Sequence, residues 1–398
     1  MNKNVTQETQ DLYRNYVMGT YPQSDILFVR GQGTELWDAR DRRYLDFASG
    51  IAVCNLGHCH PAVTKAICDQ AQKLVHVSNL YMNENQPRLA QKLIENGMDG
   101  VCFFCNSGAE ANEALIKLAR KWGSDQGRYE IIAMNDSFHG RTLATLAATG
   151  RSKYRVGFQP DMPGFKFVDY NDVEAIRAAI TDKTAAVMLE PVQGEGGIIP
   201  AAPGYLKAVR ELCDEHGIML LYDEVQCGIG RTGTFFAWQN AGVAPDALSM
   251  AKALGNGYPI GAMMASQKYA HVLTPGTHAS TFGGTPLACA AACAVIDAID
   301  QENVLENVKA RSAYLVEKLS ALSAKYPCVK GVRGQGLMLG IILDQPAGAI
   351  LSILRENGMI ALSAGENILR LVPPLTITQE DCEKAVALID AAFAKLNA

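Results

Sequence analysis

The 398-residue sequence lacks the features that mark membrane proteins, secreted proteins and nucleic-acid binders. Its formal net charge is only −5, and no run of like charge would follow a phosphate backbone or an anionic lipid surface. The longest stretch of low polarity, PLACAAACAVIDAI, is too short and too alanine-rich to span a bilayer, and the N-terminus has no apolar core of signal-peptide length. We therefore expect a cytoplasmic globular protein that binds neither nucleic acid nor a membrane.

The cysteine pattern lacks both a disulfide framework and a metal site. The eleven cysteines are odd in number and lie in a long chain, which indicates free thiols in a reducing compartment. Cys102 and Cys105 form a CxxC pair, and His58, Cys59 and His60 lie close together, but no second pair completes a tetrahedral set at zinc-like spacing. We predict no metal, with the cysteine pair packed inside a strand and the histidines in a turn.

The sequence does contain a repeated alternation of apolar strands and helices. Five apolar runs are typical of strands, at residues 101–105, 130–134, 185–190, 218–225 and 246–250. Helical periodicity follows the first run in NSGAEANEALIKLARKWG. Several runs are apolar on both faces, as in a parallel sheet that lies between helices. This pattern predicts a large α/β domain, which we place at residues 61–285.

The expected order of helices and strands changes at residue 286. One long helix is expected as far as residue 326, followed by the glycine-punctuated strand VRGQGLMLGIIL, a short helix, the strand NILRLVPPL and a final helix from Thr378. These elements predict a smaller α+β domain at residues 286–398. Alternation in GTELWDARDRRYLDF indicates that the N-terminal segment, residues 1–60, joins this small domain.

Small or polar residues follow the strands, at the edge where ligands bind in α/β sheets. After residues 101–105, the turn with Ser107, Gly108 and Ala109 opens a helix, whose free N–H groups and dipole suit a phosphate. An ordinary capped helix start has the same pattern. The sequence therefore marks this turn as a candidate anion site without deciding between the two interpretations.

Charged residues follow the next two strands. Asp223 and Glu224 end one of them, and because neighbouring strand residues face opposite sides, at most one carboxylate faces a given ligand. Lys252 follows the strand DALSM. The alternative interpretations are a solvated strand end for the carboxylates and a lysine whose ammonium reaches the surface.

The loop CGIGRTG contains Gly228, Gly230 and Gly233 in the GxGxxG spacing of dinucleotide-binding loops. The residues that follow, TFFAWQ, do not resemble the start of a helix, and no acidic residue stands about twenty positions later to bind a ribose. We therefore interpret this loop as a turn and expect no nicotinamide cofactor.

Together, the anion site, a carboxylate and a lysine predict the chemistry of pyridoxal 5'-phosphate. A partly desolvated lysine loses its proton and forms a Schiff base with an aldehyde. The helix start would hold the phosphate of the cofactor, and the carboxylate would keep its pyridine nitrogen protonated.

Several motifs also resemble one family. NSGAEANEALIKLAR, FHGRT, EPVQGEGG, LLYDEVQCGIGRTG, the segment around Lys252 and THASTFGGTPLACAAA are similar to the class III, or omega, aminotransferases, in the family's order from about Tyr13 to Phe393. The resemblance implies the fold-type I architecture, which has a large domain with a mainly parallel seven-stranded sheet and a smaller α+β domain. It also implies an obligate homodimer.

The resemblance assigns a role to each matching cofactor residue. Lys252 would bond covalently to pyridoxal 5'-phosphate and move protons, Asp223 would pair with the ring nitrogen, and Gln226 would pair with the phenolic oxygen. Phe138 would pack on the ring face. The other implied cofactor-binding residues are Ser107, Gly108, Ala109, Val225 and, on the neighbouring subunit's phosphate, Thr281.

The same resemblance assigns the substrate residues. Arg141 would bind a substrate carboxylate, and Ser280 would reach the neighbouring subunit's substrate. Glu195 and Arg370 would form a switchable ion pair, and the glycines of QGEGG would allow Glu195 to move. Tyr21 matches a substrate-facing tyrosine.

The implied reaction moves the δ-amino group of N2-acetylornithine to 2-oxoglutarate, which yields N-acetylglutamate 5-semialdehyde and glutamate, a step of arginine biosynthesis. Succinylornithine, ornithine and 4-aminobutyrate are alternative amine donors, because enzymes for all of them share the cofactor residues. An aminomutase and a cofactor-binding regulator without activity are further alternatives.

Overall fold

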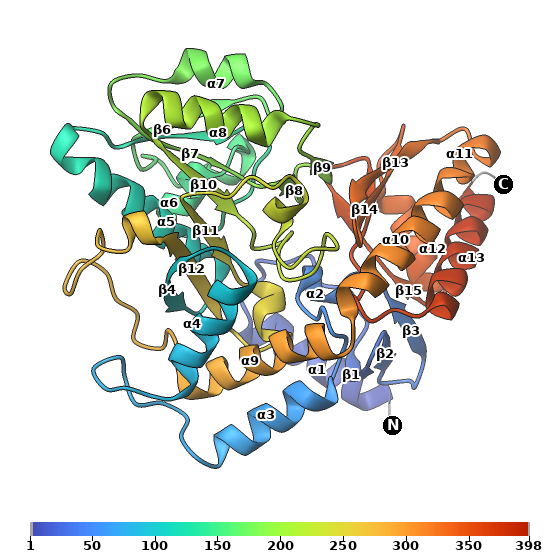
Figure 1. Ribbon diagram of the computed structural model, residues 1–398. Coiled ribbons are helices and arrows are strands. Elements are labelled where there is room, and N and C mark those ends of the chain that lie inside the picture. The colour runs from blue at the N-terminus through green and yellow to red at the C-terminus, as the bar shows by residue number, and fades with distance from the viewer. Residues whose placement is uncertain (1–2, 397–398) are drawn as a thin grey trace.

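The computed structural model describes residues 3–396, and its largest element is a seven-stranded sheet (Figure 1). In sheet order the strands are β4 (Gly100–Cys105), β12 (Gly261–Ser266), β11 (Ala247–Met250), β10 (Met219–Asp223), β7 (Thr184–Leu189), β5 (Glu130–Met134) and β6 (Phe165–Val168). β12 is antiparallel to both neighbours, and the other pairs are parallel. The predicted α/β fold with a mainly parallel sheet is confirmed.

Helices cover both faces of this sheet. Leu221 of β10 joins a cluster with Leu115 of α5 (Gly108–Gly123) and residues of α6 (Leu143–Ala148). Its neighbour Leu220 faces the other way, toward Val209 of α8 (Tyr205–His216), α4 (Asn85–Asn96) and α9 (Pro286–Gln301). Every residue of β7, β10 and β11 is buried. Both faces of the strands are therefore apolar, as the sequence indicates.

Local signals set the limits of the two best-predicted helices. The side chain of Ser107 caps α5 by accepting the backbone N–H of Glu110 at 3.2 Å, and basic residues lie in the last turn of the helix. Gly217 ends α8 in the left-handed conformation, with φ of 58°. α7 (Val173–Ala179) and α3 (Pro61–Ala71) complete the helices of this region.

The C-terminal part differs from the sequence prediction in two places. The long helix expected from residue 286 to 326 is three helices, α9, α10 (Val304–Ser320) and α11 (Leu322–Lys325), and Asn303, with a left-handed φ of 52°, separates the first two. The single strand VRGQGLMLGIIL is a hairpin of β13 (Val329–Gln335) and β14 (Met338–Leu343), which turns at Gly336 with φ of 57°. None of the described helices is long and apolar enough to cross a bilayer.

A four-stranded antiparallel sheet organises the C-terminal part. Its order is β13, β14, β17 (Ile368–Leu371) and β16 (Leu362–Ala364). The remaining helices of this part are α12 (Gly348–Glu356) and α13 (Gln379–Leu396).

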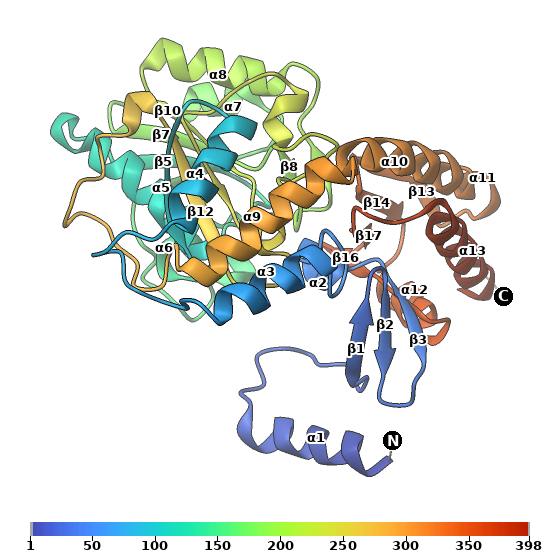
Figure 2. The same cartoon turned by 60° about the horizontal axis from the view of Figure 1, so that its bottom comes forward.

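The N-terminal segment pairs with the C-terminal part. It contains α1 (Lys3–Tyr16), β1 (Phe28–Gln32), β2 (Glu35–Asp38), β3 (Arg43–Asp46) and α2 (Ser49–Ala52), and β3 runs parallel to β15 (Met359–Ile360). Figure 2 shows α1 on the side of β1, β2 and β3, and Thr6 of α1 lines a recess together with Tyr44 of β3 and Ser352 of α12. We propose that the N-terminal segment belongs to the smaller domain and that α9, which packs on α3 and α4, connects the two domains.

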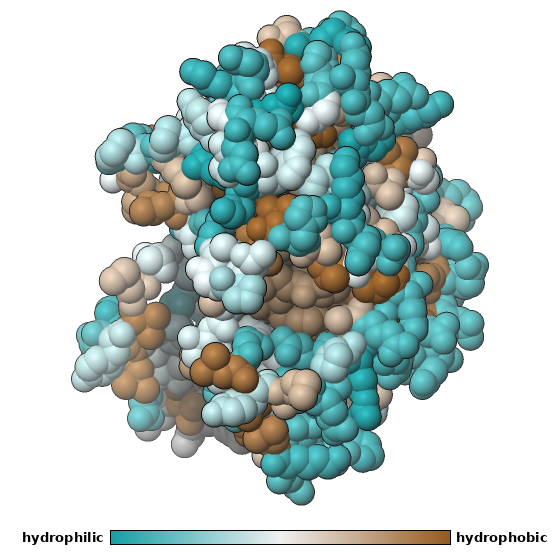
Figure 3. All heavy atoms as spheres, turned by 60° about the vertical axis from the view of Figure 1, so that its left-hand side comes forward, coloured by the Kyte–Doolittle hydropathy of each residue, from teal (hydrophilic) through white to brown (hydrophobic). Residues whose placement is uncertain are grey.

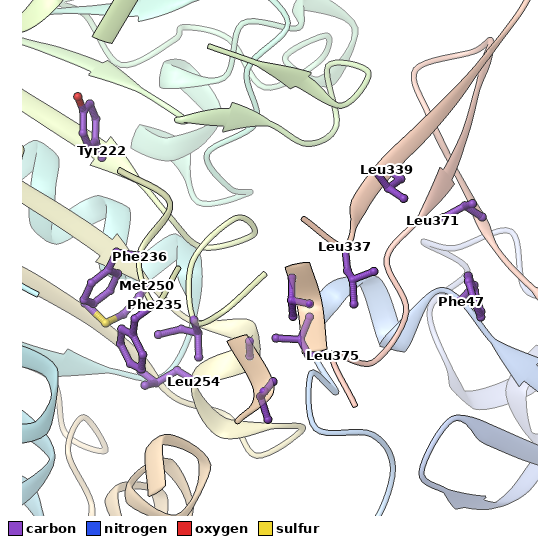
Figure 4. Close-up of a cluster of buried hydrophobic side chains, with 14 of the residues drawn as sticks. Phe47, Tyr222, Phe235, Phe236, Met250, Leu254, Leu337, Leu339, Leu371 and Leu375 are labelled. Carbon is purple, nitrogen blue, oxygen red and sulfur yellow. The ribbon is translucent and has the colours of Figure 1, made fainter. Parts of the chain in front are cut away.

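One continuous hydrophobic core links the two parts of the chain. Tyr222 and Met250 of the large sheet belong to the same buried cluster as Leu339 and Leu371 of the small sheet and Phe47 of the N-terminal segment (Figure 4). Side chains of β10 and β11 thereby share one core with the small sheet.

A buried arginine spans the same junction. Arg231 has no exposed surface, and its guanidinium donates to the carbonyl oxygens of Leu337 at 2.8 Å and Pro373 at 2.6 Å, and to the side chain of Asn55. Burial lowers the pKa of Arg231 to about 9. The loop around it forms turns with positive φ at Gly230 and Gly233, which agrees with the interpretation of CGIGRTG as a turn.

We predict that Arg231→Lys lowers the free energy of unfolding by about 2 kcal/mol or more, because lysine keeps the buried charge but cannot reach all three acceptors. Arg177→Lys is the matched control, since Arg177 is half-exposed on α7, and its change should stay within about 0.5 kcal/mol. Urea denaturation of both variants measures the difference. If Arg231→Lys is as stable as the unchanged protein, the three hydrogen bonds of the guanidinium are not required for stability.

Candidate active site

A cavity of about 440 Å³ lies at the carboxyl ends of the large sheet's parallel strands. It brings together residues that the sequence marks as separate turns after different strands. The predicted site residues that line it are Ser107, Gly108, Ala109, Phe138, Arg141, Asp223, Val225, Gln226 and Lys252.

Lys252 directly follows β11 and opens a short 3₁₀ helix, Lys252–Gly255. Its backbone has a left-handed φ of 43°, a strained conformation for a residue with a side chain. Burial lowers the pKa of the ammonium and the charge of Arg370 adds to this, while the carboxylates of Glu195 and Asp223 oppose it. The site therefore favours the neutral amine, which is the nucleophilic form.

Asp223 ends β10 with its carboxylate held from three directions. One oxygen accepts hydrogen bonds from Asn112 Nδ2 and His139 Nδ1, both at 2.7 Å, and the other accepts the backbone N–H of Val225 at 2.9 Å. The residue is only 3% exposed. Its negative charge is thus oriented at the cavity wall in a dry environment, where electrostatic interactions are strong.

His139 and Glu190 extend this network. Burial lowers the pKa of His139, but the hydrogen bond and charge of Asp223 outweigh burial, so that the pKa lies above its ordinary value. Burial raises the pKa of Glu190 to about 7, against the opposing charge of His139. The contact with Asp223 thus shifts His139 toward its protonated form beside that carboxylate.

Glu224 faces away from the cavity, as strand alternation predicts. Its carboxylate accepts the backbone N–H groups of Ala237 at 2.6 Å and Trp238 at 2.8 Å. Burial raises the pKa of Glu224 to about 8. This residue anchors a neighbouring loop, and Asp223 alone is available to a ligand.

The start of α5 fits a phosphate. A Cβ atom at Gly108 would lie 2.7 Å from Val225 Cγ1, so that only glycine brings the helix N-terminus this close to the cavity floor. The first N–H groups of the helix have no intrahelical acceptor, and Ser107 adds a hydroxyl group. With Lys252 and Asp223, this start provides the three groups that pyridoxal 5'-phosphate requires.

Two aromatic rings hold Arg141 at the cavity mouth. Its guanidinium carbon lies 3.9 Å from the ring centroid of Tyr154 and 5.4 Å from that of Phe138. No carboxylate within residues 3–396 forms a salt bridge with Arg141. Its forked donors are therefore free to bind a carboxylate.

The predicted pair of Glu195 and Arg370 is present behind the cavity. Arg370 Nη1 lies 2.5 Å from Glu195 Oε1 and also donates to Gln226 Oε1 at 3.2 Å. The side chain of Arg370 is 4% exposed and that of Glu195 is 22% exposed. Gln226 lines the cavity, so the ion pair contacts the site through it.

Besides Glu195 and Arg370, three further predicted residues do not line the cavity of the single chain. Tyr21 is 78% exposed, Thr281 is exposed, and Ser280 accepts a hydrogen bond from Asn106 at 3.3 Å. Ser280 and Thr281 are the residues that the sequence assigns to a neighbouring subunit. Their function in a shared site stays a prediction.

Sequence reasoning missed four residues of this site: Asn112, His139, Tyr154 and Glu190. Asn112 lies on the helix that starts at the phosphate site, and His139 and Glu190 lie within the motifs FHGRT and EPVQGEGG. A polar residue within each motif was the signal that could have identified Asn112, His139 and Glu190, whereas Tyr154 lies outside the motifs. The described chain contains no cluster of three or more histidine, cysteine or acidic side chains suited to a metal.

Comparison with known proteins shows similarity over nearly the whole chain. The model of the family described as aminotransferase class-III matches residues 17–393. An acetylornithine aminotransferase of Caldanaerobacter subterraneus is 48% identical over 388 residues, which cover 96% of this chain and 98% of that protein. One of Methanocaldococcus jannaschii is 48% identical over 393 residues, with 97% and 98% covered.

Solved structures show the same similarity. The N-acetylornithine aminotransferase of Stenotrophomonas maltophilia is 39% identical, with a TM-score of 0.84 and coverage of 97% of this chain and 98% of the other. The ornithine aminotransferase of Toxoplasma gondii is 33% identical, with a TM-score of 0.95 and coverage of 98% and 96%.

We predict that Asp223→Asn slows amino-group transfer by about 100-fold or more, because a neutral amide cannot keep a pyridine nitrogen protonated. Glu224→Gln should change the rate by less than about threefold, since Glu224 contacts only backbone N–H groups away from the cavity. Single-turnover kinetics of the two variants, after their folding is checked by circular dichroism, measure this. Equal losses would mean that the wrong face of β10 has been assigned to the ligand.

Proposed function

Because the chain belongs to the class III aminotransferase family, we propose that it transfers the δ-amino group of N2-acetylornithine to 2-oxoglutarate with pyridoxal 5'-phosphate as cofactor. The products are N-acetylglutamate 5-semialdehyde and glutamate. The observation that carries the proposal is the convergence of Lys252, Asp223 and the start of α5 on one cavity. Relatives named acetylornithine aminotransferase support the choice of substrate.

The cofactor residues divide the work between binding and proton transfer. When bound, pyridoxal 5'-phosphate supplies an aldehyde that bonds with amines and a ring that takes up electrons. The start of α5 and Ser107 hold the phosphate, Phe138 packs on the ring face, and Gln226 binds the phenolic oxygen. Asp223, held by His139, keeps the ring nitrogen protonated.

Lys252 has two consecutive tasks. Its amine would hold the cofactor through the aldehyde, and it would also be the base for the carbon that bears the substrate nitrogen. Both tasks require a lysine without its proton, and burial shifts the pKa of Lys252 in that direction.

The substrate residues must bind two substrates that carry their carboxylates in different places. Acetylornithine has a single carboxylate far from the reacting amine, within reach of Arg141, whereas glutamate has a second carboxylate on the reacting carbon. Arg370 is the cation for that second carboxylate, and Glu195 neutralises it while acetylornithine is bound. An unpaired arginine in a dry site would be costly and would favour the wrong orientation.

The proposal includes a homodimer in which each subunit contributes residues to the active site of the other. Leu80, Tyr81 and Met82 are 86%, 68% and 99% exposed, and Phe282 next to Thr281 is 61% exposed. Asn79 joins the two loops that carry these residues by donating to the Gly283 carbonyl oxygen at 2.8 Å. Figure 3 shows hydrophobic side chains around a recess on the face that includes these loops. An exposed apolar surface of this kind is typical of a protein interface.

The cytoplasm is the proposed location. Cysteines in the interior, such as Cys105 and Cys213, have free thiols, as expected of a reducing compartment.

The proposed activity is tested with purified protein, pyridoxal 5'-phosphate and 2-oxoglutarate against a panel of amine donors. We expect kcat/KM for N2-acetylornithine to exceed that for ornithine and 4-aminobutyrate by about tenfold or more. Succinylornithine is included to determine the preferred acyl group. A preference for 4-aminobutyrate, or turnover without any 2-oxo acid as in an aminomutase, would refute the proposed substrates.

The shared site is tested by mixing two inactive or weakened variants. Thr281→Ala should weaken retention of pyridoxal 5'-phosphate, and Lys252→Ala should abolish turnover. If Thr281 serves the partner's phosphate, a mixed dimer holds one site with both defects and one with neither, and activity should return to about a quarter of the unchanged protein's after statistical exchange of subunits. No gain over the weaker parents would contradict sharing.

A further inference from the structure

The loop that carries Glu195 is fixed by contacts on both sides. It connects β8 (Val192–Gln193) to β9 (Ile199–Pro200). Ahead of Glu195, the backbone N–H of Gly194 donates to Glu190 Oε2 at 3.0 Å. After it, Arg333 Nε donates to the carbonyl oxygen of Gly197 at 2.9 Å. The main chain at Glu195 is therefore anchored to both domains.

The glycines around Glu195 serve close packing. A Cβ atom at Gly194 would lie 2.4 Å from Gln226 Nε2, and one at Gly197 would lie 2.7 Å from Arg333 Nη2. These contacts give a different reason for QGEGG from the mobility that the sequence suggests. Glu195 must consequently change partners by rotation of its side chain rather than by movement of the loop.

Arg151 is a second buried cation beside Glu195. Its side chain is 9% exposed, and its Nη2 atom donates to the backbone carbonyl oxygen of Glu195 at 2.6 Å. Its Nε atom is buried without a hydrogen-bond partner. The carboxylate paired with it, that of Asp136, lies 3.7 Å from Nε and is 66% exposed. Arg151 thus has a buried charge with only a weak, solvent-screened counterion.

We propose that Arg151 is the second partner of the Glu195 carboxylate, which pairs with Arg370 when acetylornithine is bound and with Arg151 when glutamate or 2-oxoglutarate is bound. The inference rests on the proposed function, because it requires two substrates of different charge. Standard peptide dimensions place Arg151 Nη2 within about 5 Å of the Glu195 Cα atom, within reach of its carboxylate after side-chain rotation.

With Arg151 as a second partner, the Glu195 carboxylate is paired with a cation whichever substrate is bound. When a substrate carboxylate binds Arg370, the displaced Glu195 carboxylate would otherwise remain in a partly buried site and compete for the same guanidinium. Arg151 offers it a charged hydrogen-bond donor that is already in place. Arg151 is therefore a positioning residue that determines how well the site accepts a dicarboxylate.

Two unreactive ligands test this without turnover. Glutarate resembles 2-oxoglutarate in its two carboxylates, and N2-acetylnorvaline is acetylornithine without the δ-amine. In the protein loaded with pyridoxal 5'-phosphate, Arg151→Gln should weaken glutarate binding by about tenfold and change N2-acetylnorvaline binding by less than about twofold. Arg151→Lys, which keeps the charge, should restore glutarate affinity to within about threefold. Calorimetry measures both dissociation constants.

Two controls separate pairing from support of the loop. Arg155→Gln changes an arginine of the same segment whose partner is Asp161 at 3.0 Å, and it should affect neither ligand. In a Glu195→Gln background, Arg151→Gln should have no further effect on glutarate, because no carboxylate remains to be held. An equal loss for both ligands, or a loss that persists in that background, would overturn the proposal and leave Arg151 a structural residue.

The result is independent of the donor panel. If acetylornithine fails as a donor, the proposed substrate is wrong, while the glutarate measurements still report whether Glu195 and Arg151 are coupled. If acetylornithine reacts but glutarate binds equally well in all Arg151 variants, the proposed function holds and the second partner does not exist.

Discussion

The hydrogen bond between Asp223 and His139 is the interaction on which the candidate site depends. A carboxylate 3% exposed would be costly alone, and it is hydrogen-bonded to the buried imidazole of His139 at 2.7 Å. Asn112, from the helix that starts at the phosphate site, donates to the same carboxylate oxygen. These two hydrogen bonds to Asp223 link β10, α5 and the segment after β5. They fix the floor of the cavity relative to the phosphate site.

Hydrogen bonds to buried ionic groups also connect other parts of the interior. Glu195 neutralises Arg370 beside the cavity, and the carbonyl oxygens of Leu337 and Pro373 stabilise the guanidinium of Arg231 between the domains. Each buried ionic group connects segments that are far apart in the chain. Burial of charge therefore couples the assembly of the domains to the assembly of the site, since a displaced segment leaves a charge without its partner.

Much of the large domain could be predicted from local patterns. The apolar runs became β4, β5, β7, β10 and β11, and the helices at 108–123 and 205–216 end where their capping residues indicate. The prediction was wrong where one backbone angle decided the outcome. The left-handed Asn303 divides the expected helix, and Gly336 folds the expected strand into a hairpin, although helical periodicity continues past the first and apolar residues surround the second.

The sequence by itself determined the kind of chemistry, because the strand ends place a lysine, a carboxylate and a helix start at one edge of a parallel sheet. The motifs also identified the pair of Glu195 and Arg370. Only the tertiary structure decided which groups surround these residues. Tyr154 under Arg141, His139 beside Asp223 and Arg151 behind Glu195 act through contacts between distant segments. Periodicity and spacing describe neighbours along the chain, whereas pKa values and ion pairs depend on neighbours in space and on the exclusion of water.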